Sequence, residues 1–167
     1  YFSGRTLADK KQEIAKALVD NGASAVVLTA PDSIAWLLNI RGGDLPNTPV
    51  TLCFSILTAD GDIELFIDRR KLPPRTIAHF DSDVTIRSIG KFGDALSVLG
   101  TGKTVVQVAA NVVPAWVIDR LEADGAKILR KPDPCALPKA CKNATELAGT
   151  RAAHIRDGAA LCRFLAW

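Results

Sequence analysis

Two stretches of the chain share the same order of helical pattern, glycine and strand pattern, and this order limits the fold more than any other feature. The first is KALVDNGASAVVL (residues 16–28) and the second is DRLEADGAKIL (residues 119–129). In each, apolar residues at helical spacing end at a Gly-Ala pair, where glycine stops a helix, and aliphatic residues follow. The repeated order predicts an α/β fold. We interpret it as shared helix-to-strand chemistry and not as an internal repeat.

A hairpin interrupts this alternation near the middle of the chain. Apolar runs at Val50–Leu57 and Ile63–Ile67 flank Ala59–Asp62, whose Asp-Gly pair suits a tight turn. Antiparallel strands inside an α/β chain predict a mixed sheet. The other expected elements are strands near residues 24–30, 84–89, 105–108 and after 125, helices near 7–21, 92–100 and 113–121, a short helix capped by Asp32 or Ser33, and a proline-broken helix in 69–80.

Length and composition bound the class of protein. The chain has 167 residues, enough for one well-packed domain, and its 48% apolar and 23% charged residues are ordinary for a globular protein. No apolar run approaches the ~18 residues that cross a bilayer, so no membrane partner is expected. The net charge of +3 comes from Lys and Arg scattered among Asp and Glu, which argues against a nucleic-acid partner.

The four cysteines and two histidines do not form a recognisable site. Cys135, Cys141, His154 and Cys162 lack zinc-site spacing, and His79 stands apart from them in the sequence. No cysteine belongs to a C-x-x-C pair, and a chain with an ample core needs no disulfide framework. We therefore expect reduced structural thiols, a cytoplasmic protein, and no metal ion or other cofactor within this chain.

Acidic and glycine-rich segments favour structural roles. Asp60 and Asp62 fall in the hairpin turn, and Asp81 and Asp83 flank the start of a strand, so turn and capping uses account for all four. The GTGKT segment at residues 100–104 resembles the end of a phosphate loop. However, the first glycine of that motif is missing, and the segment precedes a strand instead of following one. We expect no phosphate site there.

The segment SIAWLLNIRGGDLPNTPV (residues 33–50) is the strongest candidate for a functional site. An apolar stretch delivers Arg41 onto a Gly-Gly turn, and such a turn allows positive φ and close backbone approach. A guanidinium can form two parallel hydrogen bonds with a carboxylate. That carboxylate can belong to a ligand or to a protein acid such as Asp44, and the sequence leaves both open. The candidate residues are Asn39, Arg41, Gly42, Gly43 and Asp44.

The C-terminal part of the chain changes character. KPDPCALPKA (residues 131–140) is rich in proline and predicts a linker or domain edge. A long helix is expected after it, because Asn143 and Glu146 have capping-box spacing. The apolar stripe of that helix needs a partner: Leu147, Ile155, Ala159, Cys162 and Leu165. Since the chain begins without methionine and ends inside this helical pattern, we expect a fragment of a longer polypeptide.

Three segments resemble one enzyme family. DSIAWLLNIRGGDLPNTPV (residues 32–50), followed by TADGDIELFID (residues 58–68), resembles the middle domain of the three-domain aminopeptidase P family, the Xaa-Pro aminopeptidases. ALPKACKNATELAGTRAAHIRDGAALCRFLAW (residues 136–167) is similar to that family's junction into its catalytic domain, and YFSGRT (residues 1–6) is similar to the segment before the middle domain. The resemblance follows the whole chain in order.

The resemblance implies a creatinase/prolidase N-terminal-type domain over residues 1–138, then a linker and the first helix of a catalytic "pita-bread" domain over residues 139–167. It implies a three-layer α/β/α sandwich with a mixed sheet, of the ribonuclease H-like kind. The family's full enzymes release the N-terminal residue before a proline, using two metal ions, commonly manganese, bound in the later domain. Expected partners are that catalytic domain, proline-containing peptides and further copies of the enzyme.

No position of this sequence matches those metal ligands, so we expect this chain alone to be inactive and to shape substrate access and domain or subunit packing. The five candidate residues would lie at the rim of the substrate site or against a neighbouring domain. A free-standing binding or regulatory module of the same fold is the alternative, against which the exposed Leu165-Ala166-Trp167 end argues. A ribonuclease H-like nuclease would need clustered acids on adjacent strands, which the pattern does not indicate.

Overall fold

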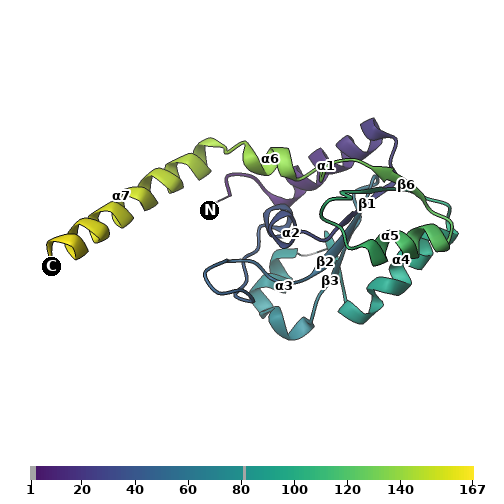
Figure 1. Ribbon diagram of the computed structural model, residues 1–167, viewed down its shortest axis with the longest axis horizontal. Helices are drawn as coiled ribbons and strands as arrows, with labels where there is room; N and C mark the ends of the chain where they lie inside the picture. Colours follow the sequence, from purple (N-terminus) through teal and green to yellow (C-terminus); the bar gives the residue numbers. More distant parts are fainter. Residues whose placement is uncertain (1–2, 81) are drawn as a thin grey trace.

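The computed structural model describes residues 3–80 and 82–167. A six-stranded sheet forms the centre of the molecule (Figure 1). The strands are β1 (Ala25–Leu28), β2 (Phe54–Thr58), β3 (Ile63–Phe66), β4 (Val84–Arg87), β5 (Val105–Val108) and β6 (Lys127–Arg130). The helices are α1 (Leu7–Asn21), α2 (Pro31–Leu38), α3 (Pro74–Phe80), α4 (Phe92–Thr101), α5 (Ala115–Ala123), α6 (Ala136–Ala140) and α7 (Ala144–Ala166), with 3-10 turns η1 (Arg69–Lys71) and η2 (Ile89–Lys91).

The sheet is mixed, as the hairpin predicts. Its strand order is β4-β3-β2-β1-β5-β6. β2 runs antiparallel to both of its neighbours, β1 and β3, whereas β1–β5, β5–β6 and β3–β4 are parallel pairs. In the hairpin, Phe54 lies opposite Phe66 and Leu57 lies opposite Ile63. The one antiparallel strand therefore accounts for the mixed character of an otherwise parallel sheet.

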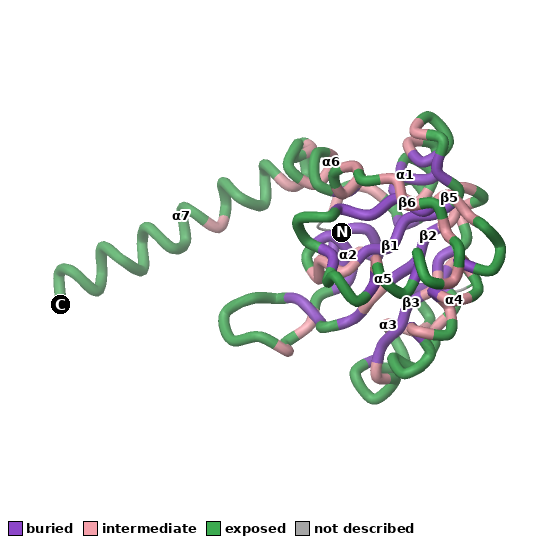
Figure 2. The backbone as a smooth tube through the Cα atoms, turned by 45° about the vertical axis from the view of Figure 1, so that its right-hand side comes forward, coloured by how far each residue is buried: buried purple, intermediate pink, exposed green. Residues whose placement is uncertain are grey.

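Helices cover both faces of the sheet, which gives three layers. Side chains alternate between faces along a strand. Val26 and Leu28 of β1 belong to the core on the face of α1, α2 and α3, and Ala25 and Val27 belong to the core on the face of α4 and α5. Buried residues are concentrated in the inner strands β1, β2, β3 and β5 and in α2 (Figure 2). The predicted α/β sandwich with a mixed sheet is confirmed.

Glycine ends the helix before the strand in both of the repeated stretches. Gly22 has φ 72° and its backbone N–H donates to the carbonyls of Leu18 and Val19 at the end of α1. Gly125 has φ 101° and lies between α5 and β6. Only a residue without Cβ adopts this left-handed conformation at little cost. The predicted helix–glycine–strand order is therefore confirmed at both places.

The strand β2 starts later than its apolar run indicates. The run begins at Val50, but the strand begins at Phe54. The backbone N–H of Leu52 donates to the carboxylate of Asp44 instead of to a neighbouring strand. Residues 50–53 therefore complete the loop after α2, and the sequence pattern was wrong about where the loop ends.

The start of α2 also differs from the prediction. Pro31 is the first residue of the helix, which suits its fixed φ, and Ala30 precedes it without a side-chain cap. Asp32 and Ser33, of which one was expected as the cap, contact Lys139 of α6 instead. The proline-broken helix resolves into η1 and α3, as expected. The prediction for Asp81 lies outside the described residues.

The proline-rich segment before α7 is more than a linker. It contains the short helix α6, and Cys135 at its start is fully buried against the core. The contact of Lys139 with Asp32 and Ser33 ties α6 to the start of α2. The segment is therefore packed onto the domain. α6 also spans position 138, and the domain boundary predicted there stays a prediction.

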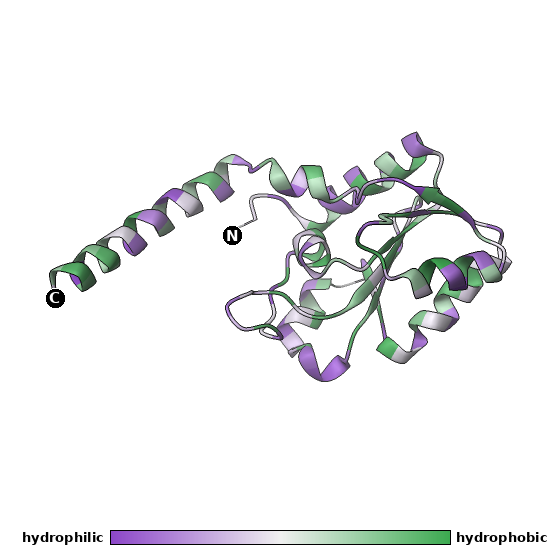
Figure 3. Ribbon diagram, viewed as in Figure 1, coloured by the Kyte–Doolittle hydropathy of each residue, from purple (hydrophilic) through white to green (hydrophobic). Residues whose placement is uncertain are grey.

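The helix α7 projects away from the sheet (Figure 1). Asn143 caps it, and Asn143 and Glu146 form the predicted capping box. None of its 23 residues is buried. Its large apolar side chains are exposed, and Figure 3 shows apolar and polar residues mixed along the helix. Within residues 3–80 and 82–167, no helix has the length and apolar character that crossing a bilayer requires.

Candidate functional site

The candidate residues lie in the loop between α2 and β2, which we call the α2–β2 loop (residues 39–53). Every residue of α2 from Ser33 to Leu38 is buried, so this helix is a fixed base for the loop. The helix ends at Asn39, which adopts the left-handed conformation with φ 55°. Asparagine tolerates that conformation better than most residues. The apolar half of the segment therefore anchors the polar half at a defined point.

The side chain of Asn39 bridges two other parts of the fold. Its Oδ1 accepts a hydrogen bond of 2.7 Å from Nζ of Lys10 on α1. Its Nδ2 donates a hydrogen bond of 2.9 Å to the backbone carbonyl of Arg5. Both polar ends of the amide are thereby used within the domain. Asn39 acts as a brace for the start of the loop.

Lys10 was missed by the sequence reasoning. Its side chain is 1% exposed, and its Nζ also donates to the carbonyl of Trp36 at 2.8 Å and lies 4.4 Å from the Trp36 ring centroid. Burial lowers the pKa of Lys10 to about 8, and the Glu146 carboxylate partly opposes this. A signal was present, because Lys10 lies on the same helical face as Leu7 and Ile14.

Arg41 does not pair with Asp44. Its Nη1 donates to the backbone carbonyl of Ile40 at 2.8 Å and, at 3.4 Å, to that of Ala35. The ion pair of Asp44 is with Lys71 of η1, with Nζ and Oδ2 2.6 Å apart. Of the alternatives that the sequence left open for Arg41, an ion pair with Asp44 is therefore not formed. The guanidinium is held against the end of α2 and remains exposed.

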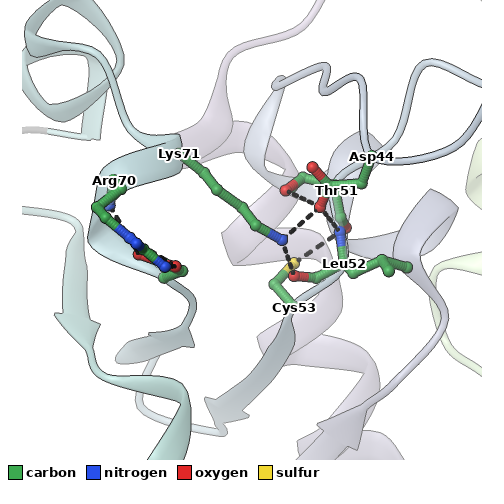
Figure 4. A network of polar contacts seen from close by, with 7 residues as sticks. Asp44, Thr51, Leu52, Cys53, Arg70 and Lys71 are labelled. Carbon is green, nitrogen blue, oxygen red and sulfur yellow. Dashed lines mark hydrogen bonds and ion pairs between the residues drawn. The ribbon is translucent and has the colours of Figure 1, made fainter.

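Asp44 organises the far side of the loop (Figure 4). Its Oδ2 also accepts hydrogen bonds from the backbone N–H of Leu52 at 2.7 Å and from the hydroxyl of Thr51 at 3.1 Å. The hydrogen bond from Lys71 holds the pKa of this carboxyl below its usual value, and the Leu52 and Thr51 donors act in the same direction. The carboxylate thus closes the loop onto η1.

The two glycines differ in what they do. Gly42 lies against the last part of the loop: a Cβ there would be 2.7 Å from Cβ of Thr51 and 2.8 Å from the carbonyl oxygen of Val50. A Cβ on Gly43 would meet no atom within 4 Å. Neither has positive φ, which instead occurs at Asn39 and Asn47. The predicted close approach is confirmed at Gly42, and the predicted positive φ is not found.

The other chemical candidates have structural surroundings. Burial raises the pKa of Cys53 to about 12, and burial likewise raises the pKa of Cys135, so neither forms a thiolate readily. A ring nitrogen of His79 contacts the carbonyl of Leu38, and one of His154 contacts that of Thr150. In the described part of the chain, no three His, Cys, Asp or Glu side chains are grouped so as to hold a metal ion.

A separate groove of about 510 Å³ lies between α4 and the outer half of the sheet. Its apolar lining includes Phe66 and Val98. Two ion pairs, Glu64–Arg87 and Lys91–Asp94, use the charges around it. Four of the charged residues that line the groove are therefore paired with one another, whereas the guanidinium of Arg41 in the α2–β2 loop is exposed.

Residues 1–146 match the creatinase/prolidase N-terminal domain family. The chain belongs to this family. Part of a bacterial protein has a similar fold: the Xaa-Pro dipeptidase of Bacillus anthracis aligns with a TM-score of 0.62 at 10% identity, over 86% of this chain and 38% of that chain. At that identity the likeness concerns the fold alone.

Relatives of this creatinase/prolidase N-terminal domain are much longer proteins. A probable Xaa-Pro aminopeptidase P of Aspergillus fumigatus is 36% identical over 99% of this chain and 26% of its own length. That of Colletotrichum graminicola is 34% identical over 99% and 28%. The X-prolyl aminopeptidase of Caenorhabditis elegans, described as a cytosolic enzyme with a di-nuclear active site, aligns with a TM-score of 0.90 at 30% identity, over 99% and 28%. The chain spans about a quarter of each.

Proposed function

We propose that this chain is a non-catalytic domain of a Xaa-Pro aminopeptidase, a metallopeptidase that releases the N-terminal residue preceding a proline. The observation that carries the proposal is the likeness to the C. elegans enzyme, which extends over 99% of the chain with a TM-score of 0.90. The fungal relatives support the same substrate class. Hydrolysis then belongs to the full-length polypeptide and not to residues 1–167 alone.

The domain acts by shaping access to the substrate site. The α2–β2 loop is braced at one end by Asn39 and at the other by the Asp44–Lys71 pair, while Arg41 stays exposed between them. A braced loop can hold a guanidinium in a fixed place at low entropic cost. We place Arg41 at the rim of the substrate site, where it binds a substrate group or a neighbouring domain and takes no part in bond cleavage.

The partners follow from the same proposal. Residues 139–167 link this domain to the catalytic domain, which covers the apolar side chains of α7. Proline-containing peptides are the substrates, and further copies of the polypeptide are additional partners. The nematode relative is described as cytosolic, and we propose the cytoplasm for this protein as well. We propose neither a nucleic acid nor a membrane as a partner.

We propose that the full-length enzyme binds two divalent metal ions and that both are manganese. The di-nuclear description of the nematode enzyme supports the number of ions. The described residues of this chain do not fit such a centre, because no three potential ligands are grouped there. We therefore assign no metal ligand to this chain, and the ions belong to the catalytic domain.

The test compares two proteins with one substrate. The full-length polypeptide and residues 1–167 alone are each incubated with a Xaa-Pro peptide and manganese, and release of the first residue is measured. We expect cleavage by the full-length protein only. Cleavage of the proline bond by residues 1–167 would contradict the non-catalytic role. A full-length protein without any cleavage would contradict the aminopeptidase assignment and favour a binding module.

A further inference from the structure

Two segments that are about a hundred residues apart in the sequence meet on one short stretch of backbone. Residues 3–6, which precede α1, form this stretch, and we call it the N-terminal strap. On one side the strap contacts Asn39, at the start of the α2–β2 loop. On the other side it contacts Asn143, the cap of α7. The α2–β2 loop and α7 thus both contact the N-terminal strap.

The strap lies close to the side chains at the start of α7. Nδ2 of Asn143 donates a hydrogen bond of 2.7 Å to the carbonyl of Ser3. Gly4 has φ 65°, and a Cβ on it would lie 2.6 Å from Oδ1 of Asn143 and 2.8 Å from Cβ of Thr145. A residue with a side chain would therefore push the strap off the helix start. The Gly4 conformation fits the strap to α7.

The contact with the loop is fixed by a buried amine. The Asn39 amide donates to the Arg5 carbonyl and accepts from Lys10. Lys10 is itself anchored by the Trp36 carbonyl and ring. Because Thr6 caps α1 through a capping box with Asp9, the strap runs directly into the helix that carries Lys10. The Asn39 amide has no freedom to turn without losing both of its hydrogen bonds.

We propose that Asn39 is a positioning residue that holds the α2–β2 loop in register with the first turn of α7 through the N-terminal strap. One consequence rests on the proposed function: the direction of α7 and the position of Arg41 at the rim of the substrate site depend on each other. The path is Lys10–Asn39–Arg5 carbonyl–strap–Asn143, and each step is a hydrogen bond or a peptide bond of the chain. Docking of α7 on its partner then fixes the loop.

Hydrogen–deuterium exchange on the full-length polypeptide tests the coupling without using activity. Asn39→Gly keeps the left-handed backbone conformation and removes both side-chain hydrogen bonds. We expect exchange at the amides of Glu146 and Leu147 in the first turn of α7 to rise about fivefold, the factor that one ordinary hydrogen bond provides. The matched control is Asn47→Gly, because Asn47 has φ 58° in the same loop and is exposed. It should change exchange only near position 47.

The reverse direction uses Asn143→Ser. Serine keeps an oxygen that caps α7 but lacks the amide that donates to Ser3. We expect faster exchange at the loop amides of Gly42, Asp44 and Leu52. Asn39→Asp is a second variant at the loop end: it keeps the acceptor for Lys10 and loses the donor to the strap. It should behave like Asn39→Gly at the first turn of α7, even if the glycine variant folds poorly.

The steady-state constants for a Xaa-Pro peptide give the second readout. Asn39→Gly and Asn143→Ser should each raise KM severalfold and leave kcat within about twofold, because a displaced rim affects binding before chemistry. Changes in exchange that stay local to each substitution would overturn the proposal. Remote changes in a protein that cleaves no Xaa-Pro bond would support the coupling and contradict the proposed function, so the two failures are distinguishable.

Discussion

Lys10 is a buried charge that contributes to the pH dependence of the domain's stability. The amine is buried and contacts a carbonyl, an amide oxygen and an aromatic ring, and no carboxylate among residues 3–80 and 82–167 forms a hydrogen bond or ion pair with it. Its pKa falls from 10.5 to about 8. At about 1.4 kcal/mol per unit, keeping it protonated in the folded state costs about 3 kcal/mol below pH 8. The contacts that brace Asn39 therefore have a cost in stability.

The pH dependence of unfolding tests this cost of burying the Lys10 amine. Between about pH 8 and pH 10.5 the unfolded chain binds more protons at Lys10 than the folded chain does, so the free energy of unfolding gains a rising contribution with pH. Lys10→Met should remove it, which urea unfolding at several pH values measures. Lys16→Met is the control, because Lys16 lies on the same helix with a side chain 75% exposed. A Lys10→Met variant with the same pH slope as the wild type would contradict this account.

Gly42 and Gly43 are neighbours in the α2–β2 loop, so the effects of an alanine at each position on stability can be compared directly. Gly42→Ala places a Cβ against the backbone oxygen of Val50, which cannot move without shifting the loop. We expect the free energy of unfolding to fall by about 2 kcal/mol, as overpacking does elsewhere. Gly43→Ala should change it by less than about 0.5 kcal/mol, because the space there is open. Chemical denaturation measures both, and equal effects would refute the close approach.

Elements that depend on neighbouring residues were predictable from the sequence. Gly22 and Gly125 end helices through their own backbone freedom, and Asn143 with Glu146 caps α7 within one turn. The hairpin followed from two apolar runs and an Asp-Gly turn. In each case the determining atoms lie within a few residues in the sequence. The alternation of these elements was enough to predict the α/β class.

The candidate site was predictable in its location and not in its contacts. The pairing of Asp44 with Lys71 and of Asn39 with Lys10 joins residues more than twenty positions apart, and such contacts leave no local pattern. Arg41 and Asp44 are three residues apart, and their pairing was one of the alternatives that the sequence left open, but in the loop they have different partners. Of these contacts, the sequence indicated only the one made by Lys10, because a charged residue lies on the apolar face of α1.

At the scale of the molecule, α7 makes residues 1–167 prone to associate when produced alone. Large exposed apolar areas are stabilised by burial against another surface. The exposed apolar side chains of the helix are Leu147, Ile155, Leu161, Phe164, Leu165 and Trp167. Since none of the residues of α7 is buried, we expect a second copy to cover these side chains at high concentration.

Sedimentation velocity checks this prediction. Leu161→Glu combined with Leu165→Glu should shift the chain to monomer, because both charges fall on the apolar face. Arg156→Glu changes the net charge by the same amount on the opposite side of the helix, nine residues or two and a half turns from Leu147. It should leave the association unchanged. A wild-type chain that sediments as a monomer while α7 stays helical would contradict the prediction.

The central claim is that the domain shapes substrate access without taking part in bond cleavage, and the kinetics of Arg41→Ala in the full-length polypeptide test it most directly. We expect KM for a Xaa-Pro peptide to rise about tenfold, the value of one charge-assisted contact, with kcat within about twofold. Arg130→Ala, an exposed arginine on the edge strand β6, is the control and should change neither constant. A collapse of kcat with KM and the unfolding temperature unchanged would contradict the account.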